Sequence, residues 1–184
     1  MANAVGKGCF TSVNEGVYTG DMKDEELQQI AEIIQTVRYP AVATVSEEGI
    51  PWNTPFERTY DQDLNFYLFS DKENQHSHNI RANSKVLLVI YNSTVAKGGE
   101  KGVYIEGLAS EVNDPEEVVR VRRVKKGPDY NPPADEFTGE ANRRMYKIVP
   151  QRIWTNEAEY KEGVFYRDYR AEVPIDQLKT LLNQ

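Results

Sequence analysis

One segment of the chain, FYLFSDKENQHSHNIRANS, gathers the side chains best suited to binding chemistry. The pattern predicts a strand that ends at Phe69 and a helix that begins at once with Ser70. Such a junction leaves backbone N–H groups and the positive end of the helix dipole facing outward, where a phosphate binds readily. Ser70 would add a hydroxyl group. Lys72 and His76 are four residues apart and share one helix face, which Asn79 continues. The sequence therefore predicts an anion site at this junction.

The same residues fit a second interpretation that needs no ligand. Ser70 and Glu73 have the spacing of a capping box, in which two side chains satisfy the N–H groups of the first helical turn. Asp71 and Glu73 also carry the same sign of charge as a phosphate. Spacing alone leaves both interpretations open.

A second candidate segment is IPWNTPFERTY, residues 50–60. Two prolines in one strand confine it to a sheet edge, which leaves backbone donors and acceptors free. Flat apolar rings beside amide and hydroxyl groups suit a planar heterocycle. The residues concerned are Trp52, Asn53, Thr54 and Phe56. The alternative interpretation is an ordinary edge strand with a packed tryptophan.

Metal and thiol chemistry are not predicted. The only histidines, His76 and His78, are two residues apart and would point to different faces of a helix, and no third ligand is evident. Cys9 is the single cysteine, so the chain has no internal disulfide and no cysteine-rich metal site.

Composition limits the class of protein. The chain has 184 residues, with 22 basic and 29 acidic side chains and a net charge of −7. This balance argues against a nucleic acid or an anionic membrane as the main partner. We interpret the basic run RVRRVKK as a solvated helix whose acidic start and basic end match its dipole. No apolar run approaches the roughly 20 residues of a membrane helix, and no secretory leader is evident, so we expect a cytoplasmic protein.

These candidates need strands and helices to position them. The predicted strands cover residues 41–46, 50–60, 64–69, 86–94, 103–113, 146–156 and 164–173, and the predicted helices cover residues 23–37, 70–83, 114–125, 134–144 and 174–182. Short turns between successive strands favour antiparallel pairing. The sequence therefore predicts a mainly β, α+β fold built as a small antiparallel barrel. We expect one domain over residues 1–184, with an N-terminal arm and helix (1–37), a barrel core (38–113) and later helices and strands (114–184).

Three segments in a fixed order give the chain a family resemblance: RYPAVATVSEEGIPWNTPF, YLFSDKENQHSHNIRANSKVLLVIYN and VYIEGLASEVNDPEE. They resemble the pyridoxamine 5′-phosphate oxidase-like group of split β-barrels, which bind flavin mononucleotide (FMN). The resemblance covers roughly Arg38 to Pro115, with a weaker echo at KIVPQRIW. It implies a six-stranded antiparallel split β-barrel with flanking helices, and a homodimer with two FMN sites at the subunit interface.

The resemblance also implies which residues would hold FMN. Ser70 stands at the strand end that touches the phosphate, whereas Gln75 and His76 stand where the oxidases carry cations. The strand from Trp52 to Arg58 would border the flavin ring, and Trp154 resembles a late aromatic supplied by the partner subunit. The complete set of expected cofactor-binding residues is Trp52, Asn53, Thr54, Phe56, Arg58, Phe69, Ser70, Lys72, Gln75, His76, Asn79 and Trp154.

One departure bears on the expected activity. The oxidases carry a late Arg-x-His-x-Arg signature for the substrate phosphate, and the nearest match, residues 166–170, has no histidine. We therefore expect an FMN-dependent oxidoreductase acting on an unknown small substrate, related to the pyridoxamine 5′-phosphate oxidases but distinct in activity. The alternative is a non-catalytic split-barrel dimer that holds flavin, deazaflavin or haem.

Overall fold

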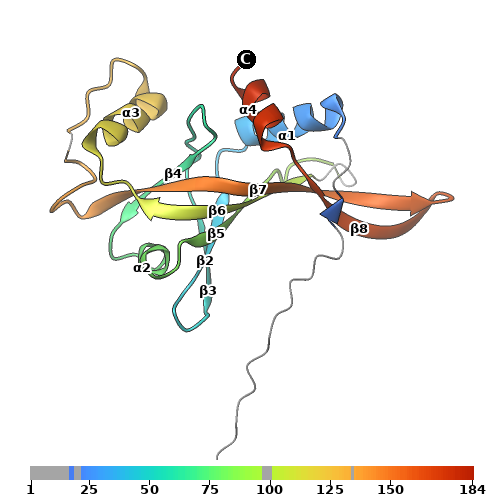
Figure 1. Ribbon diagram of the computed structural model, residues 1–184, viewed down its shortest axis with the longest axis horizontal. Helices are drawn as coiled ribbons and strands as arrows, with labels where there is room; N and C mark the ends of the chain where they lie inside the picture. Colours follow the sequence, from blue (N-terminus) through green and yellow to red (C-terminus); the bar gives the residue numbers. More distant parts are fainter. Residues whose placement is uncertain (1–16, 19–21, 97–100, 134) are drawn as a thin grey trace, which may run out of the picture.

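The computed structural model describes residues 17–18, 22–96, 101–133 and 135–184. Nearly all of the predicted N-terminal arm lies outside these residues. Strands dominate the fold, and β7 runs through the middle of the molecule, with α1 and α4 on one side and α2 on the other (Figure 1). Among the described residues, no helix combines the length and the apolar character needed to cross a bilayer.

Twelve elements follow one another along the described chain. They are β1 (Val17–Tyr18), α1 (Asp24–Thr36), β2 (Ala41–Val45), β3 (Pro51–Pro55), β4 (Phe66–Asp71), α2 (Gln75–Ala82), β5 (Lys85–Tyr91), β6 (Gly102–Glu111), α3 (Pro115–Lys126), β7 (Arg143–Lys161), β8 (Val164–Glu172) and α4 (Ile175–Leu182).

The strands form one eight-stranded sheet in the order β1-β8-β7-β6-β5-β2-β3, with β4 paired to β7. All pairs are antiparallel except β1 with β8. The six strands β2 to β7 form the split-barrel part of this sheet. Between β3 and β4 an isolated bridge joins Tyr60 to Phe66, and the Tyr67 N–H donates to the Thr59 carbonyl at 2.8 Å. The predicted α+β split-barrel class is therefore confirmed, and β1 and β8 extend the sheet beyond the six expected strands.

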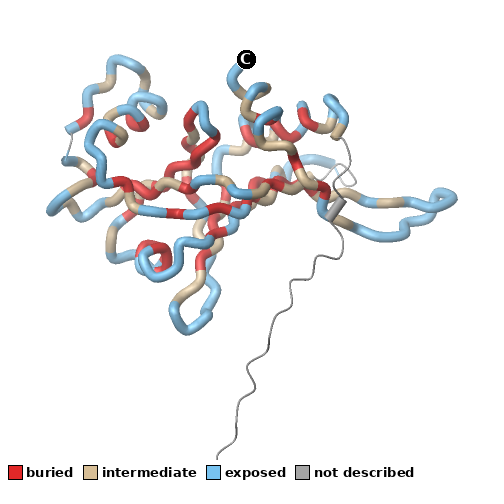
Figure 2. The backbone as a smooth tube through the Cα atoms, viewed as in Figure 1, coloured by how far each residue is buried: buried red, intermediate tan, exposed pale blue. Residues whose placement is uncertain are grey.

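The core lies where the inward faces of the strands meet α1. The helix buries Ile30 and Ile34, as its apolar spacing predicts, against inward side chains such as Val42 and Leu88. Figure 2 shows buried backbone along the middle of β7 and exposed backbone on the β7–β8 hairpin. β5 lies between β2 and β6, as expected for a central strand, but its side chains alternate between buried and exposed. One face of β5 is therefore available to something outside this chain.

A close approach of backbones shapes the barrel at Gly107. A Cβ atom there would lie 2.9 Å from the Ile148 side chain and 3.0 Å from the Val149 carbonyl oxygen. The register between β6 and β7 shifts at this point. Such a bulge needs a residue without a side chain.

Two predicted boundaries and one predicted helix are wrong. β4 continues through Ser70 to Asp71 because these residues pair with Arg144 and Arg143 of β7, so α2 begins only at Gln75. The strand predicted over residues 50–60 ends at Pro55. The Phe56 N–H still donates to the Pro40 carbonyl at 2.9 Å, but Pro40 has no N–H to return the bond and continue the ladder. The helix predicted over residues 134–144 is absent from its described part, where turns lead directly into β7. Residue 134 itself lies outside the described residues.

Candidate functional site

A buried histidine lies at the centre of the candidate site. His76, only 5% exposed, extends from the first turn of α2 toward the ends of β3 and β4. Its Nε2 atom lies 2.7 Å from the Ser70 hydroxyl, and its Nδ1 atom lies 3.2 Å from the Thr54 hydroxyl. The Asn74 amide also donates to the Ser70 hydroxyl at 2.8 Å. β3 and the junction between β4 and α2 therefore meet at one imidazole ring.

A second set of hydrogen bonds fixes α2 to the barrel. The Gln75 amide donates to the Asn79 side chain at 2.8 Å, and the Asn79 amide donates to the Thr44 hydroxyl at 3.0 Å. Asn79 and Thr44 are almost fully buried. Buried polar groups that are satisfied in this way hold neighbouring elements in one arrangement.

The first turn of α2 has unused donors. Asn74 occupies the N-cap position, but its side chain bonds Ser70 and makes no cap hydrogen bond. Among the described residues, the N–H groups of Gln75 and His76 form no hydrogen bond. The start of α2 therefore presents two unbonded N–H groups on the residues that follow Asn74, whose amide bonds the Ser70 hydroxyl. The capping box predicted for Ser70 and Glu73 does not form, because Ser70 belongs to β4.

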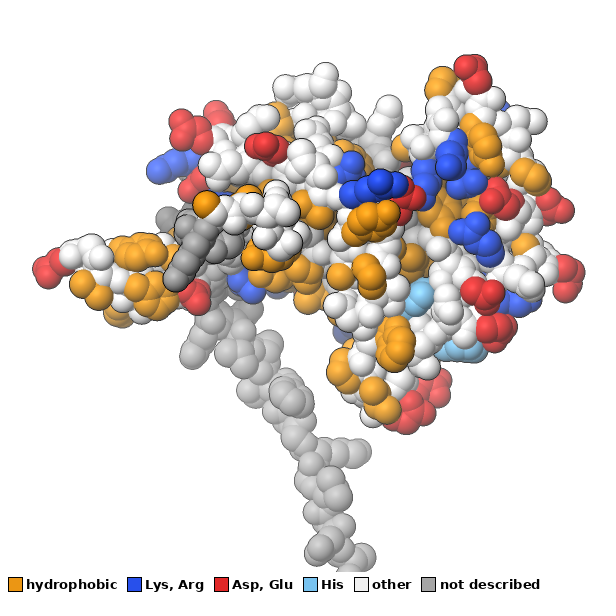
Figure 3. All heavy atoms as spheres, turned by 180° about the vertical axis from the view of Figure 1, so that it is seen from behind, with side chains coloured by type: hydrophobic (Ala, Val, Ile, Leu, Met, Phe, Trp, Pro, Cys, Tyr) orange, Lys and Arg blue, Asp and Glu red, His pale blue; other side chains and the backbone are white. Residues whose placement is uncertain are grey.

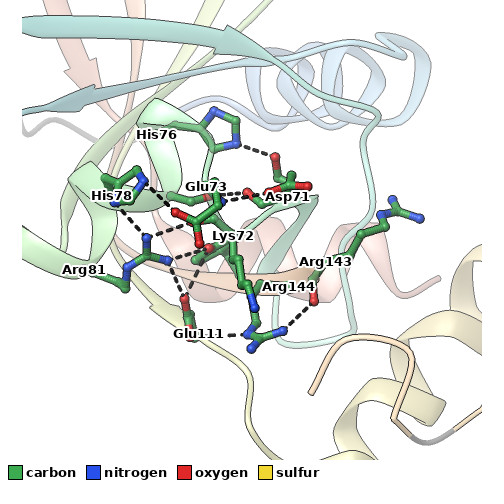
Figure 4. Close-up of polar contacts among 12 residues, drawn as sticks. Asp71, Lys72, Glu73, His76, His78, Arg81, Glu111, Arg143 and Arg144 are labelled. Carbon is green, nitrogen blue, oxygen red and sulfur yellow. Dashed lines mark hydrogen bonds and ion pairs between the residues drawn. The ribbon is translucent and has the colours of Figure 1, made fainter. Parts of the chain in front are cut away.

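The site holds little positive charge. Burial lowers the pKa of His76, so the imidazole is neutral near pH 7. Lys72 lies in the turn before α2, and its side chain runs away from His76 (Figure 4). Arg81 is occupied by Glu111, at 3.0 Å, and by His78, also at 3.0 Å. The structure therefore brings the hydroxyl and the imidazole together, as expected, but the Lys72 ammonium does not join them.

The expected cofactor-binding residues fall into two groups. Those that meet at this site are Thr54, Ser70, Gln75, His76 and Asn79. Trp52 and Asn53 are exposed on β3. Thr44 belongs to the same network but was not expected from the sequence. Its inward position in the alternating pattern of β2 was the available signal.

Three other expected residues contact parts of the fold away from His76. Arg58 donates to the carbonyl oxygens of Ile34, at 2.8 Å, and Val37, at 3.0 Å, and so caps the end of α1. Phe56 is buried in the core. Phe69 packs on Phe137, with their ring centroids 5.2 Å apart.

Trp154 is on β7, a different element from those that form the His76 site. The Arg152 guanidinium lies 4.7 Å from its ring. Its buried Nε1 atom has no hydrogen-bond partner among the described residues. No group of three or more metal-ligating side chains gathers within the described part of the chain.

The donor set fits one end of a phosphorylated flavin. A phosphate accepts hydrogen bonds from helix N-terminal N–H groups and from hydroxyls, and both are present here and unshielded by a cap. The fit comes from hydrogen bonding and the helix dipole, because the network contains no lysine or arginine.

Fold and site together define a split barrel with a polar site where β4 leads into α2. Residues 27–157 match the family model described as pyridoxamine 5′-phosphate oxidase. The match covers more than half of the chain, so the chain belongs to the pyridoxamine 5′-phosphate oxidase family. Comparison with curated proteins gives no match.

Solved structures share the fold. A conserved hypothetical protein from Mycobacterium tuberculosis is 24% identical, with a TM-score of 0.56 over 72% of this chain and 83% of that one. A pyridoxamine 5′-phosphate oxidase candidate from Listeria innocua is 21% identical, with a TM-score of 0.53 over 69% and 94%. The haem storage protein HutZ from Vibrio cholerae is 19% identical, with a TM-score of 0.55 over 68% and 91%. At these identities the likeness shows the fold alone.

Proposed function

We propose that this chain binds FMN and acts as a flavin-dependent oxidoreductase on a small substrate. The observation that supports the proposal is the start of α2, where the unbonded N–H groups of Gln75 and His76 lie beside the Ser70 hydroxyl. This is the place where the family resemblance puts the FMN phosphate. A bound flavin would supply hydride or electron transfer, and the protein would supply binding and orientation.

The chain's own residues have distinct parts in this proposal. Ser70 and the two N–H groups would donate to the phosphate. His76 would hold the Ser70 hydroxyl in place through its 2.7 Å contact. Asn79, bonded to Thr44, would keep the first turn of α2 against the barrel. Trp52 offers an exposed ring on β3 that could cover the flavin.

We also propose that the functional unit is a homodimer. Exposed apolar side chains lie on the outward face of the central strands. They are Leu87 of β5, Leu108 of β6 and Val149 of β7, and the strand registers place all three on one face. An apolar face of this kind is typical of a protein–protein interface.

A haem-binding function has less support from the site, although haem proteins share the fold. Both ring nitrogens of His76 contact hydroxyl groups, and those of His78 contact Glu73 and Arg81. Neither imidazole can therefore ligate an iron without breaking one of these contacts.

The test is the visible absorption spectrum of the purified protein with and without added FMN. Flavin peaks near ~370 and ~450 nm, or a rise in melting temperature on adding FMN, would support the proposal. A colourless protein that FMN does not stabilise would overturn it. If FMN binds, loss of the flavin absorbance under anaerobic NAD(P)H distinguishes a reductase from a passive carrier.

A further inference from the structure

A second cavity lies away from α2, between α1 and the far ends of the central strands. It has a volume of about 770 Å³ and is lined by residues of α1, the end of β5, the start of β6 and the β7–β8 hairpin. This volume is within the usual range for a small-molecule site. Three tyrosines contribute to its lining: Tyr91, Tyr104 and Tyr160.

One of these rings is held firmly against its neighbours. Tyr104 lies so close to Gly102 that a Cβ atom on Gly102 would come within 3.0 Å of the tyrosine ring. On β8, the Arg170 guanidinium lies 3.8 Å from the centroid of the same ring. Stacking on an aromatic ring leaves the N–H edge of a guanidinium free to bind a carboxylate with two hydrogen bonds.

The charges around the cavity are only partly paired. Lys101 and Glu157 form a close ion pair, with 2.6 Å between Nζ and Oε1. Asp168 and Arg170 are two residues apart on β8 and both line the cavity, which places them on the same face of the strand. Within the part of the chain that the structure describes, neither has an ion-pair partner. The cavity therefore offers one unpaired cation, Arg170, with Asp168 beside it on the same strand and with aromatic walls next to both. Glu32 of α1 is a second carboxylate in the lining that has no ion-pair partner among the described residues.

We propose that this cavity binds a small aromatic zwitterion, of the class of the aromatic α-amino acids. The carboxylate would pair with Arg170, the ammonium group with Asp168, and the ring would pack between Tyr91 and Tyr104. Within one chain this cavity lies apart from the His76 site, because none of its lining residues belongs to β3, β4 or α2.

Calorimetric titration of the full chain with three probes tests the proposal. L-Tryptophan carries both charges, indole-3-propionate lacks the ammonium group, and tryptamine lacks the carboxylate. We expect L-tryptophan to bind about tenfold or more tightly than either analogue, since each analogue loses a charge-assisted contact.

Two variants assign the contacts. Arg170→Gln should abolish the preference for L-tryptophan over tryptamine, and Asp168→Asn should abolish the preference over indole-3-propionate. Arg167→Gln is the matched control, because Arg167 pairs with Glu159 and does not line the cavity. It should bind all three probes as the wild type does.

Three outcomes would overturn the proposal. These are equal affinity for the three probes, no binding at millimolar concentration, or an Arg170→Gln variant that keeps the full preference. Competition between FMN and L-tryptophan would show one shared site and would also contradict it. If FMN fails to bind while L-tryptophan binds as expected, only the proposed flavin function fails.

Discussion

At the scale of single residues, the site is defined by a neutral histidine at the position where the related oxidases carry a cation. His76 contacts two hydroxyl groups, and burial lowers its pKa. Its place between β3 and β4 therefore depends on hydrogen bonds, and any charge on the ring would have to be buried without an ion-pair partner among the described residues. Because of that cost, protonating His76 should lower the free energy of unfolding.

The first prediction follows from the sign of this shift. The unfolded chain protonates His76 near the ordinary pKa of about 6.5, whereas the folded chain protonates it at lower pH. The free energy of unfolding should therefore fall as pH decreases below about 6.5, by at most about 1.4 kcal/mol per pH unit from this group. Above pH 6.5 the neutral ring contributes its full share to the free energy of unfolding, and this contribution no longer changes with pH. His76→Gln should reduce the slope, measured by urea unfolding between pH 7 and pH 5.

His78→Gln provides the control for this experiment. His78 is on the same helix, but its side chain is 50% exposed. The control should keep the wild-type slope. Equal slopes in the His76→Gln variant and the wild type would show that the ring is not held neutral by the fold.

A second prediction concerns the missing cation. Gln75 is exposed at the start of α2, beside the unbonded N–H groups. Gln75→Arg should raise FMN affinity about tenfold through a charge-assisted hydrogen bond to the phosphate, and should leave riboflavin affinity unchanged. Quenching of flavin fluorescence measures both affinities.

Ala82→Arg adds the same charge at the other end of the helix, where Ala82 is exposed. It should alter neither affinity. An equal gain for FMN and riboflavin in Gln75→Arg would mean that the phosphate lies elsewhere.

At the scale of elements, the sequence predicted most strands and helices but misplaced the boundary that matters most for the site. Ser70 and Glu73 have a good local capping pattern, yet Ser70 and Asp71 gain ladder pairing with Arg144 and Arg143 of β7. A partner more than seventy residues away cannot be read from local spacing, and pairing in the sheet overrides a local helix start. The core face of α1 was predictable because it depends only on the periodicity of the helix itself.

The contacts of Arg58 also could not be read from local sequence, and they lead to a third prediction. The sequence places it near the flavin, whereas the structure has it donating two hydrogen bonds to carbonyls at the end of α1. Arg58→Met keeps the aliphatic part and removes both bonds, so it should lower the free energy of unfolding by about 1–3 kcal/mol. Urea unfolding measures the loss, and FMN affinity should stay the same.

Arg38→Gln is the matched control. Arg38 pairs with Glu57 through a side chain that is 70% exposed, so its loss should cost less than about 1 kcal/mol. Weaker FMN binding by Arg58→Met at unchanged stability would instead support the role expected from the sequence.

At the scale of the whole molecule, the placement of the basic side chains says more about possible polyanionic partners than the net charge does. The basic run RVRRVKK lies on α3, whose first turn is acidic and whose last turn is basic, as the dipole interpretation predicts. The run is not wholly solvated, however. Arg122 is buried beside Glu136 and the Phe137 ring, and Lys125 pairs with Glu57 at 2.7 Å. These cations hold α3 against the barrel, which leaves fewer of them for a polyanionic partner.

Two of the exposed apolar regions bear on assembly. The tip of the β7–β8 hairpin projects from the body with exposed Tyr160, Val164, Phe165 and Tyr166 (Figure 3). The other is the outward face of β5, β6 and β7, where Leu108 is 42% exposed and paired in register with Val149. The face is the better candidate for a symmetric interface, because a rigid sheet presents its side chains in a fixed arrangement.

The last prediction tests this face as the dimer interface. Leu108→Glu places a charge at its middle, and burying an unpaired carboxylate in an apolar contact is costly. The variant should sediment as a monomer at a concentration where the wild type is a dimer. Its circular dichroism spectrum and unfolding midpoint should remain those of a folded chain.

Val124→Glu, on the exposed side of α3, is the control and should remain dimeric. A wild type that sediments as a monomer, or a Leu108→Glu variant that still dimerises, would remove this face from consideration. Loss of FMN together with the dimer would further indicate that the flavin site needs both subunits.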